Sequence, residues 1–258
     1  MKALFFDLDD TLLWDKKSIK ESLRATCLEA EEQTGIHHKE LENTVREEAA
    51  SLYASYDTYE FTKSIGINPF EGLWGDFTDD INIGFRKMNE IIYDYQEKAW
   101  THSLSKHGVS DSPLGSTLAE RFRFHRRKLP FIYADTFEVL AELKENYHLL
   151  LLTNGAPSLQ QEKLNMTPQL VPFFEYIVVS GAYGIGKPAP SIFEHCLDLM
   201  QLSSDDALMI GDNLHTDILG SNRAGMKNIW INREKKEPNK DIPFTWEVQS
   251  LSEIPGLL

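Results

Sequence analysis

The sequence predicts an α/β protein in which a parallel sheet with helices on both faces is interrupted after its first strand by an all-helical block. Short apolar runs alternate with helix-like segments over residues 135–232, and such alternation is typical of a parallel sheet. Residues 15–128 contain almost no strand-like run, and their apolar residues recur at helical spacing. We therefore expect a Rossmann-like core formed by residues 1–15 and 129–258, with an inserted helical domain at residues 16–128.

The first predicted strand ends in a group of acids. Residues 3–6 are apolar, and carboxylates follow at Asp7, Asp9 and Asp10. A short apolar run that ends abruptly in acid is typical of a buried parallel strand whose carboxyl end opens into a site. Asp7 and Asp9 point to the same side of extended backbone, where their charges repel unless a cation or a proton lies between them. One interpretation is a metal site, and the other is an acidic surface turn that caps the next element.

The inserted block is expected to contain five helices. The spacing of its apolar residues predicts them, and segments rich in Gly and Asp separate them at 72–80 and 108–115. The expected helices span residues 20–33, 39–56, 58–65, 83–107 and 117–128.

Two features of this block have both a structural and a binding interpretation. Its aromatic side chains either pack the helices together, which is the more common role, or line a pocket. The basic run at 121–128 either forms a solvated helix face or attracts an anionic substrate. The aromatic residues are Trp74, Phe77, Tyr93, Tyr95 and Trp100, and the basic residues are Arg121, Arg123, Arg126, Arg127 and Lys128.

Helices and strands alternate through the rest of the predicted core. The expected helices span residues 135–146, 157–165, 190–200 and 217–224, and the expected strands span 147–152, 176–180, 207–210 and 228–232. The tail at 233–258 is polar and rich in proline, so no element is predicted there, although Trp246 is expected to pack onto the core.

Polar residues also follow the later strands. Thr153 and Asn154 end one strand, Asp212 follows another, and Lys187 lies shortly after a third. Each has an ordinary structural explanation: a strand-to-turn transition, a solvated lysine before a helix, or a helix cap for Asp212 and Asp217. Because crossovers between parallel strands are right-handed, however, the strand ends share one edge, where open α/β sheets bind ligands. Their joint occurrence with the first group of acids favours a functional site.

Composition and charge exclude several classes of function. The chain has 258 residues and a formal net charge of −14, so it can bury a sizeable core, and its surface repels nucleic acid. Cys27 and Cys196 lie far apart without zinc-ligand spacing, so we expect buried thiols and no disulfide. The run before Asp7 is too short for a signal peptide, and no run reaches the ~18 apolar residues of a membrane helix. We expect a cytoplasmic protein that binds neither nucleic acid nor membranes; its oligomeric state is open.

The motifs together resemble those of the haloacid dehalogenase-like (HAD) hydrolase superfamily. They occur in the order found in that superfamily, and the helical block is similar to its cap, which in relatives closes over the substrate. The four motifs are Asp7-Leu8-Asp9-Asp10-Thr11-Leu12, Thr153-Asn154, Lys187-Pro188, and Gly211-Asp212-Asn213 with Asp217.

The resemblance implies a Mg²⁺-dependent phosphatase that acts on a small phosphorylated metabolite through an aspartyl-phosphate intermediate. Asp7 would be the nucleophile, and Asp9 would be the general acid and base. Mg²⁺ would be held by Asp7, the backbone carbonyl of Asp9 and the side chain of Asp212, because it prefers hard oxygen ligands. Asp217 would support this site from outside the coordination sphere, through water or Lys187.

The remaining motif residues would bind the transferring phosphoryl group. Thr153 would offer its hydroxyl, Asn154 its backbone N–H and Lys187 its positive charge. Asp9 favours phosphoryl transfer over dehalogenation, since relatives that displace halide lack this second aspartate. A phosphomutase stays open, as does a non-catalytic interaction protein that docks through the aromatic helical domain. Nucleotides, sugar phosphates and small phospho-acids all fit as substrates.

Overall fold

The computed structural model describes all 258 residues, which form two compact units, Met1–Trp14 with Ile132–Leu258 and Asp15–Phe131. The boundaries differ from the expected ones by one residue at the first junction and three at the second. Asp15 begins a helix of the second unit, and the carbonyl of Leu129 accepts a hydrogen bond from Ser18 in that helix. Both ends of the inserted segment are therefore tied to its own helices.

The first unit is built on one sheet of six parallel strands in the order β3-β2-β1-β4-β5-β6. The strands are β1 (Ala3–Phe6), β2 (His148–Thr153), β3 (Tyr176–Val179), β4 (Ala207–Gly211), β5 (Lys227–Ile231) and β6 (Trp246–Val248). The predicted parallel α/β fold is confirmed, and β1 to β5 agree with the expected strands to within one residue at each end. Because β1 pairs with both β2 and β4, its carboxyl end opens beside theirs.

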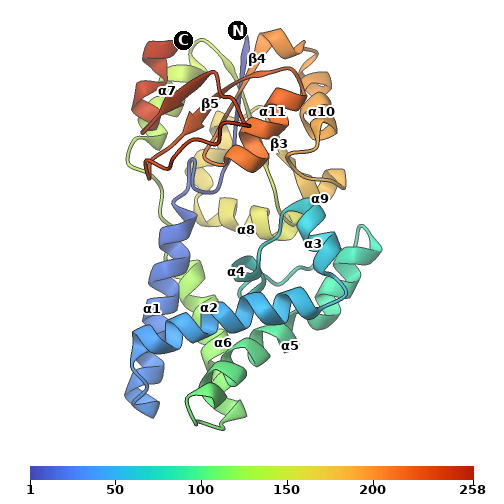
Figure 1. Ribbon diagram of the computed structural model, residues 1–258. Coiled ribbons are helices and arrows are strands. Elements are labelled where there is room, and N and C mark those ends of the chain that lie inside the picture. The colour runs from blue at the N-terminus through green and yellow to red at the C-terminus, as the bar shows by residue number, and fades with distance from the viewer. The chain divides into compact units, whose positions relative to one another are not determined.

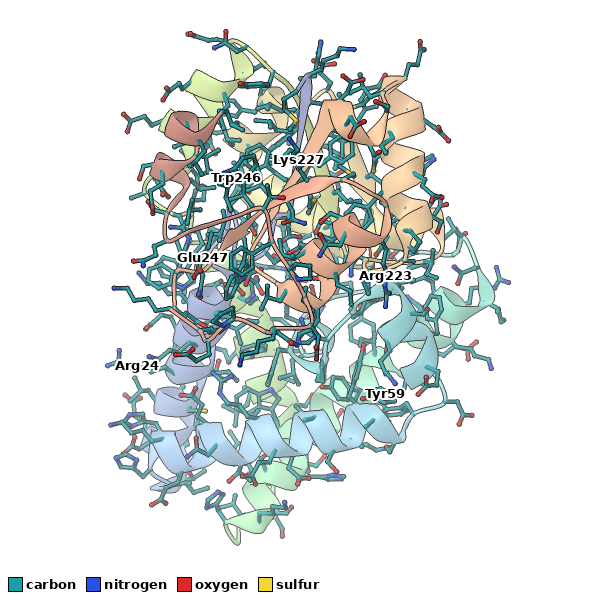
Figure 2. All side chains as sticks on the ribbon, turned by 45° about the horizontal axis from the view of Figure 1, so that its top comes forward. Arg24, Tyr59, Arg223, Lys227, Trp246 and Glu247 are labelled. Carbon is teal, nitrogen blue, oxygen red and sulfur yellow. The ribbon has the colours of Figure 1, made fainter.

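Strand β6 was not predicted. Trp246 is in register with Ile229, and Val248 with Ile231, so this short strand extends the sheet beyond β5. Figure 2 shows Trp246 and Glu247 on this edge strand. The expected packing of Trp246 is confirmed, because its partly buried ring packs against a hydrophobic cluster on one face of the sheet.

Helices cover both faces of the sheet (Figure 1). Alternate side chains of β1 supply the two faces: Leu4 and Phe6 belong to the cluster with α7 and α8, and Ala3 and Phe5 to the cluster with α10. The helices are α7 (Thr136–Lys144), α8 (Pro157–Met166), α9 (Ser180–Tyr183), α10 (Pro190–Met200) and α11 (Leu219–Arg223), with a π-helical turn at Leu214–Ile218.

The second unit contains helices only. They are α1 (Asp15–Thr34), α2 (His38–Ser55), α3 (Tyr59–Ile65), α4 (Pro69–Gly72), α5 (Ile83–Lys106) and α6 (Ser112–Lys128). All five expected helices are present, and α4 is an additional single turn. Asn68 caps this turn by accepting hydrogen bonds from the backbone N–H groups of Phe70 and Glu71.

The aromatic residues of the helical unit mostly form its core. Trp74, Phe77, Tyr95 and Trp100 are fully buried, whereas Tyr93 is half exposed. The packing interpretation is therefore confirmed for four of the five side chains.

All four arginines of the basic run are paired within the helical unit. Arg126 is buried, pairs with Asp15 and lies over the ring of Trp74. The other pairs join Arg121 to Glu29, and Arg123 and Arg127 to Asp76. These four arginines hold helices and loops of the unit together, a role that neither interpretation of the run anticipated.

Cys27 and Cys196 are buried free thiols, as predicted. None of the helices combines the length and the apolar character that crossing a bilayer requires.

Candidate active site

The polar residues predicted at the strand ends lie at one edge of the sheet of the first unit. Asp7 directly follows β1, Thr153 ends β2 and Asp212 directly follows β4, and these three strands are neighbours. Lys187 lies after β3 and Asp217 after β4, and both reach this edge through direct contacts between side chains.

Lys187 places one buried ammonium between two carboxylates. Its Nζ lies 2.7 Å from Asp7 Oδ1 and 2.7 Å from Asp217 Oδ1, and it donates a hydrogen bond to the carbonyl of Leu152 at 2.8 Å. Burial disfavours the charge, but Asp217 and Asp7 together raise the pKa of Lys187 above its ordinary value. The ammonium is therefore charged at neutral pH, and the interpretation as a solvated lysine is excluded.

Asn154 holds the backbone of Lys187 in place. Its Nδ2 donates to the Lys187 carbonyl at 2.9 Å, and the Lys187 N–H donates to Asn154 Oδ1 at 2.9 Å. Gly186 packs so closely that a Cβ there would lie 2.7 Å from Asn154 Oδ1. The side chain of Asn154 thus positions Lys187, whereas the expected role of its backbone N–H stays a prediction.

Asp7 is buried and hydrogen-bonded on both oxygens. Lys187 contacts Oδ1, and the Thr11 hydroxyl donates to Oδ2 at 3.2 Å. Thr11 Oγ1 also accepts a hydrogen bond from the Asp212 N–H at 3.1 Å, so it joins the ends of β1 and β4. Burial raises the pKa of the Asp7 carboxyl well above its usual range, the Lys187 ammonium opposes this, and the neighbouring carboxylates raise it further.

Asp9 is held by two residues of α8 that the sequence motifs did not identify. Lys163 Nζ lies 2.8 Å from Asp9 Oδ2, and Gln160 Nε2 donates to the same oxygen at 3.2 Å. Gln160 Nε2 also donates to Thr153 Oγ1 at 2.8 Å. The side chains of Gln160 and Lys163 are both buried. Because Gln160 contacts both Asp9 and Thr153, it joins Asp9 to the end of β2.

The repulsion expected between Asp7 and Asp9 is therefore relieved by two separate ammonium groups. Lys187, which Asp7 shares with Asp217, offsets the charge of Asp7, and Lys163 offsets that of Asp9. Asp10, which follows, has a backbone φ of 62°, in the left-handed region that turns the chain.

A sequence signal for Gln160 and Lys163 does exist. Leu159 and Leu164 lie on the buried face of α8, and Gln160 and Lys163 lie beside them at helical spacing. An amide and an ammonium on the apolar stripe of a helix that directly follows Thr153 indicate a polar partner in the interior.

Three carboxylates form a candidate cation site. Ligand oxygens of Asp7, Asp212 and Asp217 lie within 4.8 Å of one another. Hard carboxylate oxygens in this number suit Mg²⁺ better than a soft metal ion. The close approach requires a glycine at the end of β4, because a Cβ at Gly211 would lie 2.3 Å from Asp217 Oδ2.

Asp217 has a partner on each of its two oxygens, as Asp7 does. Its Oδ1 faces Lys187, and its Oδ2 accepts a hydrogen bond from the Asn213 N–H at 3.1 Å. The supporting role expected for Asp217, and direct ligation by Asp7 and Asp212, stay predictions. The expected contribution of the Asp9 backbone carbonyl stays a prediction.

Comparisons with known proteins point to one family of hydrolases. A family model of haloacid dehalogenase-like hydrolases matches residues 1–225. The chain is 30% identical over 255 residues to the phosphoserine phosphatase of Thermus thermophilus, and the match covers 98% of each chain. It is 34% identical over 178 residues to the N-acylneuraminate-9-phosphatase of Mus musculus, which covers 67% of this chain and 71% of the relative.

A solved structure supports the fold. The HAD-hydrolase YfnB of Bacillus subtilis, bound to magnesium, superimposes with a TM-score of 0.68 at 22% identity, over 100% of this chain and 98% of that one. The resemblance inferred from the four motifs is thereby confirmed: the chain belongs to the haloacid dehalogenase-like hydrolases.

Proposed function

We propose that the chain is a Mg²⁺-dependent phosphatase that hydrolyses a small phosphate monoester through an aspartyl-phosphate on Asp7. The observation that carries the proposal is the pairing of buried Asp7 with Lys187 beside a second, separately held aspartate, Asp9. The phosphatase names of two relatives support the reaction class. Within this proposal the first unit is the catalytic core, and the helical unit is the cap.

In the first step, an oxygen of Asp7 would attack phosphorus while the bond from phosphorus to the leaving oxygen breaks. Asp9 would give its proton to that oxygen, which leaves as an alcohol. Lys187 lies against the nucleophile, where its charge favours the ionised carboxylate against burial and offsets negative charge on the phosphoryl oxygens.

In the second step, water would attack phosphorus and break its bond to Asp7. Asp9, now ionised, would take the proton from this water. Inorganic phosphate is released, the Asp7 carboxylate is restored, and Asp9 again carries a proton, so the cycle balances.

The charges of the site support a divalent cation. When all four are ionised, the carboxylates of Asp7, Asp9, Asp212 and Asp217 exceed the ammonium groups of Lys163 and Lys187 by two formal negative charges; when Asp9 carries its proton, the excess is one. Either excess would repel a phosphate dianion. Asp7, Asp212 and the backbone carbonyl of Asp9 would hold Mg²⁺. When bound, the ion supplies positive charge at the phosphoryl oxygens.

The presence of Asp9 also favours phosphoryl transfer over dehalogenation. A halide leaves carbon without a proton, so displacement of halide has no use for an acid beside the nucleophile. Asp9 is held by Lys163 and Gln160 within the same unit as Asp7, which favours a role in proton transfer.

The proposal is tested by measuring phosphate release from a panel of phosphorylated metabolites that includes phosphoserine, sugar phosphates and nucleotides. We expect release that requires Mg²⁺, stops with EDTA and is abolished in Asp7→Asn. The matched control is Asp241→Asn, which changes an exposed aspartate and should retain full activity. An isomerised product instead of phosphate would indicate a phosphomutase, and full activity of Asp7→Asn would exclude the mechanism.

A further inference from the structure

We propose that Gln160 and Lys163 are positioning residues that orient Asp9 for proton transfer. Replacing either residue should therefore lower kcat/KM more for a substrate whose leaving group needs a proton than for one whose leaving group does not. This inference rests on the proposed phosphatase function. It adds two residues of α8 to the four motifs from which the site was predicted.

The hydrogen bonds of Asp9 divide its two oxygens between two tasks. Lys163 Nζ and Gln160 Nε2 both contact Oδ2, at 2.8 Å and 3.2 Å. Asp9 Oδ1 is buried and has no hydrogen-bond partner in the protein. These two contacts fix the plane of the carboxyl group and occupy one oxygen, so the proposal assigns the exchange of the proton to Oδ1, the oxygen without a protein partner.

Gln160 couples this orientation to the end of β2. The same Nε2 also lies within hydrogen-bond distance of Thr153 Oγ1 and of the carbonyl of Asn154, so its two hydrogens are shared among three acceptors. Gly155 packs against the amide, since a Cβ there would lie 2.8 Å from Nε2. The amide oxygen could not replace Nε2 here, because it would face the oxygens of Asp9 and Asn154. The orientation of Gln160 is therefore set by its neighbours, and Asp9 is tied to the strand end that carries Thr153.

The placement of Lys163 argues against direct binding of the phosphoryl group. Its side chain is 1% exposed, as is that of Lys187, so the two lysines differ in their partners, and the Lys163 ammonium contacts Asp9 Oδ2. Lys187, by contrast, contacts the nucleophile Asp7. Lys163 therefore acts through Asp9, and its removal should affect the step in which Asp9 gives up a proton.

Leaving-group dependence distinguishes this role from a merely structural one. An aryl phosphate such as p-nitrophenyl phosphate releases a stable phenolate without a proton, whereas an alkyl phosphate such as glycerol 2-phosphate releases an alkoxide that needs one. The ratio kcat/KM reports the step that expels the leaving group, because hydrolysis of the phosphoryl enzyme comes later and is common to both substrates.

The test measures kcat/KM for both substrates in wild type, Lys163→Met and Gln160→Met, with Mg²⁺ present. For each variant we expect a loss of about 10²-fold with the alkyl phosphate, as for a misplaced general acid, and less than about tenfold with the aryl phosphate. Lys163→Arg, which keeps the charge, should recover part of the alkyl activity. Lys227→Met, at the exposed start of β5 (Figure 2), is the matched control and should behave as wild type with both substrates.

Three results would overturn the inference. An equal loss with both substrates would indicate a structural role, and unchanged kinetics would indicate none. Weaker inhibition of Lys163→Met by inorganic phosphate would indicate direct phosphate binding. If the wild type hydrolysed neither substrate nor any other phosphate ester, the proposed function itself would fail, and this inference with it.

Discussion

Replacing Lys187 by methionine should destabilise the first unit, because two buried carboxylates would lose the ammonium that they share. Lys187 Nζ lies 2.7 Å from both Asp7 and Asp217, and the side chains of Lys187 and Asp217 are each 1% exposed. Removing one partner from a buried ion pair costs about 3–5 kcal/mol. Since 1 kcal/mol shifts the melting temperature of a chain near this size by about 2–4 °C, the Tm at pH 7 should fall by about 6–20 °C.

This loss should shrink as the pH falls. Burial raises the pKa of Asp7 and Lys187 opposes that effect, so removal of Lys187 raises the Asp7 pKa further. An acid whose pKa is higher in the folded state than in the unfolded state destabilises the fold when it is ionised. The cost is therefore present in full above the folded pKa and is relieved as the pH drops through it.

Calorimetry of wild type and Lys187→Met between pH 5 and 8 would measure both effects. The double variant Lys187→Met, Asp217→Asn should regain part of the stability, because it removes one of the stranded charges. Lys227→Met, an exposed lysine in the same unit, should change the free energy of unfolding by less than about 0.5 kcal/mol. An unchanged Tm for Lys187→Met at pH 7, or a loss that grows toward low pH, would refute the reasoning.

Two further predictions concern small residues and thiols. Gly211→Ala would place a Cβ 2.3 Å from Asp217 Oδ2 and should lower kcat/KM for phosphate esters by at least about tenfold. The control Gly256→Ala, whose Cβ would have no atom within 4 Å, should leave kcat/KM unchanged. Equal activities of the two variants would contradict this prediction. Burial raises the pKa of Cys27 and of Cys196 to about 12. Ellman's reagent at pH 8 should therefore label neither thiol in the folded protein and both thiols in urea. Rapid labelling without denaturant would show that the thiols are not buried.

Much of the site could be predicted because its residues stand where apolar runs stop. Each strand end that meets the shared edge has a polar residue directly after or at its last position, as Asp7, Thr153 and Asp212 do. The parallel topology then brings these positions together, whatever their separation in the chain. Local sequence and one topological rule were therefore sufficient to place them.

The residues that were missed depend on packing that the local sequence does not describe. A lysine within a helix is usually solvated, and only the packing of α8 places Lys163 against Asp9, 154 residues earlier. Arg126 in the basic run likewise pairs with Asp15, 111 residues earlier. Strand β6 has only three residues, which is too short for a recognisable strand pattern in the sequence. It forms because its backbone pairs with β5, and not because its residues have a strong strand propensity.

Covalent labelling of Asp7 tests the central claim most directly. The enzyme is mixed with an aryl phosphate that carries the radioactive label in its phosphoryl group, and the reaction is quenched in acid during turnover. The protein is then digested, and the labelled peptide is sequenced. We predict a base-labile label on Asp7 that is absent in Asp7→Asn and accumulates in Asp9→Asn, because Asp9 is needed to activate water more than to expel an aryl leaving group. Label on a different residue, or turnover of Asp9→Asn with no labelled protein at any quench time, would contradict the mechanism.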